Sequence, residues 1–173
     1  MIKFFYKFPK KGGGILFREL LRKKKEISKE ECIEILEKEK RGVLSVIGDE
    51  GYPYGMPMNH FYNEDDGNIW FHCGKKGHRI DSILKEPKVS FCVFEKGTKK
   101  ENDWALLVRS VVVFGKIEII SDPETIAEIT AKLSRKFTSD EEYIKNEIEK
   151  FGKDTLLLKL VPEHISGKIV TES

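Results

Sequence analysis

The sequence YPYGMPMNHFYNEDDGNIWFHCGKKGHRIDSILKEPKVSF, residues 52–91, contains two strand-like runs separated by a turn. The runs are Tyr52–Tyr62 and Asn68–Cys73, and the connection Asn63–Gly67 between them ends in glycine. Extended, aromatic-rich runs joined by a short Gly-containing turn are typical of hairpins. We therefore expect these two runs to pair as antiparallel strands.

Two prolines interrupt the first run. Pro53 and Pro57 have no main-chain N–H to donate to a ladder, so this strand should be an edge strand or be broken by a bulge. Main-chain groups near Met56–Asn59 would then be free to bond a ligand.

A loop rich in glycine and cations follows the second run. It is Gly74-Lys75-Lys76-Gly77-His78-Arg79, and it leads into a short helical pattern of Ile80, Ile83 and Leu84 that Pro87 ends. Helix N-termini present free N–H groups and a partial positive charge, which favours an anion such as phosphate. The alternative is that these cations belong to an ordinary solvated turn.

The composition indicates a single domain behind a basic arm. Residues 1–25 hold nine Lys or Arg and one acidic residue, so a total net charge of +2 leaves the other residues at −6. We assign residues 1–26 to an arm and residues 27–173 to the domain, whose acidic balance argues against a nucleic-acid-binding body. The arm has two interpretations: a tail or subunit clasp, or a weak contact with anionic lipid or nucleic acid.

Cysteine usage and hydropathy point to a cytoplasmic protein. The three cysteines, Cys32, Cys73 and Cys92, form no CxxC motif and cannot all pair, which argues against a disulfide framework or a zinc ribbon. No run of about 18 apolar residues could span a membrane. The apolar residues of the N-terminus are interrupted by lysines, so no signal peptide is expected.

The remaining elements predict an antiparallel barrel of six or seven strands with peripheral helices. Ser28 and Glu31 form a capping box for a helix that runs to about Lys40, with Gly42 as its C-terminal cap. Two later helices should start at Asp122 and Ser139, the second again with a capping box. The other expected strands are Val43–Ile47, Val89–Glu95, Leu106–Ile120 with a bulge at Gly115, Thr155–Val161 and His164–Ile169.

Several common chemistries find little support in the residues. There is no GxGxxG after a strand, no Walker loop and no GxSxG. A His72–Cys73 dyad fails because neighbours on a strand point to opposite faces. A metal site formed by His60, His72, Cys73 and His78 is conceivable, although no tight ligand spacing supports it. We therefore expect no metal, and a flat ligand that bears a phosphate is what remains.

Two further residues have open interpretations. Arg109 lies within a strongly apolar strand, so it must face solvent, an ion pair or a ligand. His72 could face a ligand, where its near-neutral pKa would suit proton donation or substrate orientation, or it could be a satisfied histidine within the sheet.

The chain resembles the flavin-binding split-barrel proteins related to pyridoxamine 5′-phosphate oxidase, and within them the nitroimidazole-resistance branch. Four segments carry this resemblance, and their order and spacing match over roughly residues 27–169. The segments are GYPYGMPMNHFY, IWFHCGKKGHRIDSILKEPKVSF, VRSVVVFGKIEII and HISGK. The chain departs from the family in its basic arm and in carrying Arg79 where many relatives show Lys.

The resemblance implies a homodimer with FMN at the subunit interface. The flavin ring would lie along Met56–Asn59, Gly74–Arg79 would hold the phosphate, and His72 would face the flavin as the candidate catalytic residue. The RSV segment at 109–111 would close the site from the second subunit. The residues expected to contact the cofactor are Met56, Pro57, Met58, Asn59, His72, Gly74, Lys75, Lys76, Gly77, His78, Arg79, Arg109, Ser110 and Val111.

The resemblance also implies an activity. We expect an FMN-dependent oxidoreductase that reduces nitroaromatic compounds with electrons from NAD(P)H or another donor. Two rival hypotheses remain: a reductase that uses the deazaflavin F420 on the same barrel, and a flavin- or haem-binding carrier or sensor without turnover.

Overall fold

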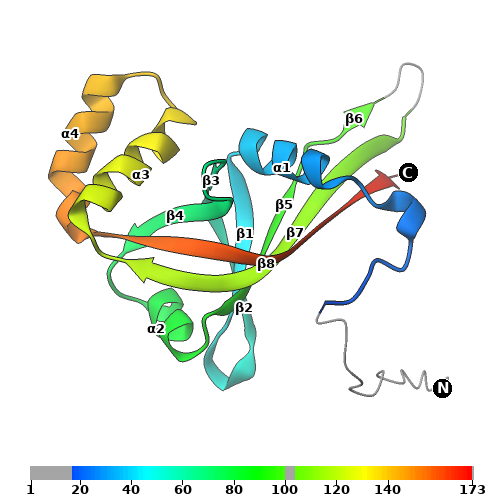
Figure 1. Cartoon of the computed structure of the whole chain (residues 1–173), viewed down its shortest axis with the longest axis horizontal. Coiled ribbons are helices and arrows are strands. Elements are labelled where there is room, and N and C mark those ends of the chain that lie inside the picture. Colours follow the sequence, from blue (N-terminus) through cyan, green and yellow to red (C-terminus); the bar gives the residue numbers. More distant parts are fainter. Residues whose placement is uncertain (1–16, 100–103, 173) are drawn as a thin grey trace.

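The computed structural model describes residues 17–99 and 104–172, which form one curled antiparallel sheet with helices around it (Figure 1). The strands are β1 (Arg41–Ile47), β2 (Pro53–Asn59), β3 (Phe61–Asn63), β4 (Asn68–Gly74), β5 (Lys88–Phe94), β6 (Thr98–Lys99), β7 (Leu106–Ile120) and β8 (Thr155–Glu172). The helices are α1 (Lys29–Lys38), α2 (His78–Lys85), α3 (Pro123–Arg135) and α4 (Glu141–Phe151). Three 3₁₀ turns, Lys23–Lys25, Asp49–Gly51 and Gly152–Asp154, complete the elements. None of the helices in these ranges has the length and apolar character needed to cross a membrane.

The strand order is β2-β1-β5-β7-β8-β4-β3, with β6 paired to β7 off this path. The sheet curls until β2, at one end of the order, comes back beside β4. Of the described strands only β3 pairs with the outer side of β4, and it reaches no further than Trp70. The predicted antiparallel split barrel with peripheral helices is therefore confirmed, and its split runs between β2 and the second half of β4.

The run predicted as one strand, Tyr52–Tyr62, is two strands that divide at His60. β3 pairs with β4 as the predicted hairpin requires, but β2 pairs with β1 instead, so the hairpin is confirmed only for Phe61–Asn63. The main-chain N–H of His60 donates to the Lys40 carbonyl, and its fully buried ring bonds the Leu36 carbonyl at 2.8 Å. These bonds turn the chain from one end of the sheet to the other. The prediction that the proline-containing strand is an edge is confirmed for β2.

β7 and β8 form a long, bent ribbon that crosses the molecule (Figure 1). The predicted irregularity at Gly115 is present, but the extra residue is Glu163 on β8, because Phe114 pairs with His164 and Gly115 with Pro162. A Cβ on Gly115 would meet the Val161 carbonyl oxygen, so the two strands approach closely here. The two strands predicted at the C-terminus are consequently one strand with a bulge.

Helix starts match the predictions better than helix ends. Ser28 and Glu31 form the predicted capping box of α1, and Asp122 caps α3. α1 ends at Lys38, and Gly42 is a β1 residue whose Cβ would meet the Phe91 ring, so its prediction as a cap was wrong. Ser139 does not cap α4 either; Asp140 does, through the Tyr143 N–H.

α3 and α4 form a hairpin beyond the ends of β4 and β8, to one side of the barrel (Figure 1). Ile126 and Ile129 of α3 pack on Trp70 of β4 and Leu157 of β8 in a cluster of their own. Lys136, just past α3, donates to the Glu39 carbonyl at 2.7 Å and so ties the hairpin to the end of α1. This hairpin therefore packs against the middle of β4 and the start of β8.

Candidate functional site

α2 begins immediately after a glycine in an unusual conformation. Gly77, the N-cap, has φ +123°, where a side chain would be strained, and no side chain caps the helix. The N–H groups of the first turn are therefore available to a ligand. The two residues that follow diverge. His78 stacks on Tyr54 at 4.5 Å and lies 3.5 Å from an Asp49 carboxylate oxygen, whereas Arg79 faces the split of the barrel.

A cleft of about 520 Å³ occupies that split. Six of the predicted cofactor residues line it, and they come from β2, β4 and α2: Pro57, Met58, Asn59, His72, Gly74 and Arg79. Cys73, Phe151, Asp154 and Thr155 complete the lining. The cleft thus gathers residues from both edges of the split sheet and from the start of α2.

Arg79 borders the cleft, and its hydrogen-bond partners among the described residues are sulfur atoms. Its Nε lies 3.0 Å from the Met56 sulfur, and it also bonds the Cys73 thiol. Thioethers and thiols are weak acceptors, and no carboxylate in the described part of the chain forms an ion pair with this guanidinium. Most of the N–H donors of Arg79 are therefore available to a ligand.

His72 lies on the cleft side of β4, and its side chain is partly exposed. Desolvation and the positive charge of Arg79 lower its pKa, so the ring is neutral at pH 7. It makes no hydrogen bond to any residue in the described ranges. Burial raises the pKa of the adjacent Cys73 thiol, and Arg79 opposes that rise only in part. A neutral imidazole and a protonated thiol therefore face the cleft region.

The lysines of the loop do not line this cleft. Lys75 borders a separate cavity beside the start of α3 and the end of α4, and Lys76 is exposed. Their predicted contact with the phosphate remains a prediction that the positions of this single chain do not test.

Arg109 is already paired within its own chain. Its Nε and Nη2 donate to Glu95 at 2.8 Å each, and Nη1 lies 3.4 Å from Glu34 and 3.6 Å from Glu31. These carboxylates raise its pKa still further. Ser110 is half-buried and Val111 is fully buried in the core. The expectation that this segment reaches the cleft from a second subunit stays a prediction.

The histidines predicted as conceivable metal ligands are not gathered into one site in the described part of the chain. Burial, with Lys136 in support, lowers the pKa of His60 to about 3, so its ring stays neutral in the core. Of His60 and His72, only His72 borders the cleft. Among the described residues, no three His, Cys, Asp or Glu side chains lie close enough to share a metal ion.

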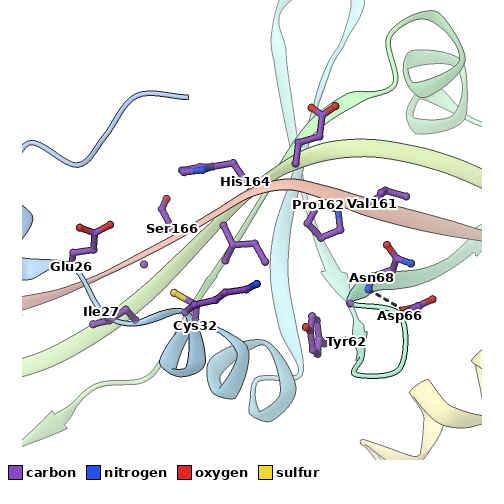
Figure 2. Close-up of a pocket in the computed structure, with 15 residues that line it drawn as sticks. Glu26, Ile27, Cys32, Tyr62, Asp66, Asn68, Val161, Pro162, His164 and Ser166 are labelled. Atoms are coloured by element: carbon purple, nitrogen blue, oxygen red, sulfur yellow. Dashed lines mark hydrogen bonds between the residues drawn. The ribbon is translucent and has the colours of Figure 1, made fainter. Parts of the chain in front are cut away.

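A second large cavity, of about 600 Å³, lies between α1, the β3–β4 turn and β8 (Figure 2). None of the predicted site residues line it. Its polar groups are mostly engaged: Asp66 accepts from the Asn68 N–H, Glu163 pairs with Lys116, and His164 stacks on Phe17. We therefore place the candidate site in the cleft between β2 and β4.

Sequence reasoning missed Phe151, Asp154 and Thr155. They lie 70 or more residues beyond the motifs and reach the cleft because β8 pairs with β4, with Thr155 opposite Gly74. The lone signal in the sequence was Gly152, which ends α4 and begins the turn that carries them.

A comparison with protein families finds that the model described as pyridoxamine 5′-phosphate oxidase matches residues 28–169. No curated protein matches the chain by sequence.

Solved structures share the fold at low identity. A conserved hypothetical protein from Mycobacterium tuberculosis gives a TM-score of 0.74 at 20% identity, over 87% of this chain and 90% of that one. A candidate 5-nitroimidazole antibiotic resistance protein from Bacteroides thetaiotaomicron gives 0.69 at 20% identity, over 84% and 87%. A FAD-binding protein from Mesorhizobium loti gives 0.60 at 22% identity, over 84% and 96%.

Proposed function

Because the chain belongs to the pyridoxamine 5′-phosphate oxidase-like family, we propose that it is a flavoprotein that binds FMN in the cleft between β2 and β4. The observation that carries this proposal is Arg79, a guanidinium that bonds sulfur atoms and no carboxylate in the described ranges, beside an uncapped helix N-terminus. A phosphate there would satisfy both sets of donors at once.

The residues present fit this cofactor. The cleft volume of about 520 Å³ lies within the range of cofactor sites. A Cβ at Gly74 or Gly77 would meet nothing within 4 Å, so the loop leaves open space beside the helix start. β2 is an edge strand, which leaves main-chain groups for a flat ring. Asp154 is the acidic member of the lining.

A bound flavin would supply hydride or electron transfer, and the chain would bind and orient it. Arg79 and the N–H groups of the first α2 turn would hold the phosphate. His72, with its lowered pKa, would act as a neutral hydrogen-bonding group toward substrate rather than as a strong acid. In this proposal the enzyme reduces a small, flat substrate such as a nitroaromatic compound, with a nicotinamide as the electron donor.

We further propose a homodimer, because a single half-barrel would leave a bound ring open to water. Large apolar side chains are exposed around the same end of the chain: Tyr52 is 75% exposed and Leu84, predicted to belong to the helical apolar pattern of α2, is 70% exposed. Light scattering of the FMN-loaded protein should give twice the 20.0 kDa chain mass. A monomer that binds FMN tightly would contradict this proposal.

The direct test is FMN titration of Arg79→Ala, followed by flavin fluorescence. Loss of one charge-assisted phosphate contact should weaken binding by about 1.5–3 kcal/mol, or roughly 10- to 150-fold. The matched control is Arg135→Ala, which removes an exposed pair with Glu141 far from the cleft and should leave affinity unchanged. An Arg79→Ala titration that overlays the wild type would remove the phosphate assignment.

The activity is tested by the absorbance spectrum of the purified protein and its change with NADH or NADPH in the absence of oxygen. Flavin bands that bleach support a reductase. Flavin bands that persist favour another donor or a carrier, and a deazaflavin or haem spectrum would replace FMN as the cofactor.

A further inference from the structure

The α3–α4 hairpin encloses a cavity that the proposed cofactor does not need. Its volume is about 330 Å³, and it is lined by one face of each helix. Ile126, Thr130 and Ser134 repeat every four residues along α3, and Ile144, Glu147 and Ile148 face them from α4. Two helices that packed only to stabilise one another would fill this space with apolar side chains.

The cavity adjoins the cleft. His72, Phe151 and Thr155 line both the cavity and the cleft, so a molecule in the cavity has its inner end at His72. His72 has no hydrogen-bond partner in the described ranges, which leaves its ring nitrogens available to an occupant.

An acidic group in the cavity also lacks a partner. Glu147 forms no ion pair or hydrogen bond with any residue in the part of the chain that the structure describes. Its half-buried carboxylate is therefore free to accept from a donor-bearing ligand between the helices.

The charge of the lining limits the kind of molecule that fits. Glu147 is the charged residue among the lining residues, and neither Lys nor Arg belongs to the lining. An anionic ligand would face this carboxylate with no cation to offset it. The isoleucines and Phe151 favour an apolar ring, and a cavity of about 150 Å³ is already enough for benzene.

We propose that this cavity is the substrate-binding site, and that it takes a compact aromatic molecule carrying a cationic or hydrogen-bond-donating nitrogen. Glu147 binds that nitrogen, and the apolar ring extends between α3 and α4 toward His72. That the occupant is a substrate rests on the proposed function, because only a flavin bound in the neighbouring cleft could reduce it. Binding of the occupant itself needs no flavin.

The test is isothermal titration of the whole protein with three probes of one size: benzylamine, benzyl alcohol and benzoate. Benzylamine should bind at least tenfold more tightly than benzoate, with benzyl alcohol between them. Glu147→Gln should weaken benzylamine binding about tenfold and leave benzyl alcohol unchanged. Glu142→Gln removes an exposed carboxylate from the first turn of the same helix and should change neither.

Thr130→Val provides a second control, because the Thr130 hydroxyl oxygen is buried and out of reach of an occupant. It should leave benzylamine affinity unchanged. Equal binding of benzoate and benzylamine, or unchanged benzylamine affinity in Glu147→Gln, would overturn the proposal.

FMN titration of the same samples separates this proposal from the proposed function. Benzylamine binding without FMN binding would support the proposed ligand site and contradict the proposal that the chain is a flavoprotein. FMN binding with no charge preference among the probes would support the flavoprotein and contradict the proposed ligand site. When both bind, saturating benzylamine should shift the flavin absorbance, since the two sites meet at His72; an unchanged spectrum would contradict their contiguity.

Discussion

Arg109 lies under α1 and Arg79 at the start of α2, and these helices sit at opposite ends of the half-barrel (Figure 1). Sequence reasoning gave both arginines to the cofactor. Arg109 has two 2.8 Å bonds to Glu95 and two further carboxylates within 3.6 Å. Arg79 has a thioether and a thiol. Since an interior polar group without a strong partner is costly, the first arginine stabilises the fold, and the second is available to a ligand.

The same division holds for the neighbours of each arginine. At the α1 end His60 bonds the Leu36 carbonyl and Lys136 bonds the Glu39 carbonyl, so polar groups there close the ends of secondary structure. At the α2 end His72 and the first α2 turn have no such partners. The type of a residue therefore makes it a candidate for a site. Its hydrogen-bond and ion-pair partners then indicate whether it stabilises the fold or is available to a ligand.

The largest test of this comparison is to remove each arginine in turn without adding ligand. Arg109→Met should lower the free energy of unfolding by about 3 kcal/mol, since the largely buried Glu95 carboxylate loses its close cation and keeps only Lys38, 3.9 Å away. Arg79→Met should change it by less than about 0.5 kcal/mol, because no carboxylate depends on it. Urea unfolding at pH 7 measures both. Equal losses would show that Arg79 is structural as well.

A smaller effect is expected from two glycines. Gly42→Ala, near the α1 end, puts a methyl group within 2.7 Å of the Phe91 ring and the Cys92 carbonyl, so we expect about 2 kcal/mol of destabilisation. Gly74→Ala, in the cleft, meets nothing within 4 Å and should leave the stability unchanged. Thermal unfolding of both variants measures this difference in stability. A loss of stability in Gly74→Ala would show that other atoms fill the space beside Gly74 in the cleft.

The smallest effect is the acid sensitivity contributed by His60. Its pKa is about 3 in the folded chain and near 6.5 when unfolded, so between these values the unfolded chain binds more protons and folding weakens as pH falls. His60→Gln should remove about 1 kcal/mol of the stability lost between pH 6.5 and 5.5. His72→Gln should keep most of that loss, because the exposed ring can be hydrated in the folded state. Urea unfolding at the two pH values provides the measurement.

The elements with local signals could be predicted from the sequence. The Ser28–Glu31 box, Asp122 before Pro123 and the apolar pattern of 106–120 depend on near neighbours, and each produced the expected element. The predictions that failed are those in which a tertiary contact overrides the local signal. Gly42 resembles a helix cap, but its role is to admit the Phe91 ring, and His60 divides a continuous apolar run because α1 offers it a carbonyl.

The candidate site was predicted in part for the same reason. Residues 57–59, His72, Gly74 and Arg79 belong to contiguous motifs and meet in the cleft. Phe151 and Thr155 arrive through the pairing of β8 with β4, a contact that no local pattern reports. The ion pairs of Arg109 were equally out of reach, because Glu31, Glu34 and Glu95 come from two distant segments.

The open edge of the sheet bears on how this chain avoids aggregating with other chains. An edge strand offers unpaired main-chain groups to any other extended chain, and β2 is such an edge. Pro53 and Pro57 each remove one N–H from that strand, which makes it a poor template for a foreign strand while it stays open to a small flat molecule. The prolines thus act as a guard against aggregation, and replacing them would expose the protein to association during folding, before anything occupies the split.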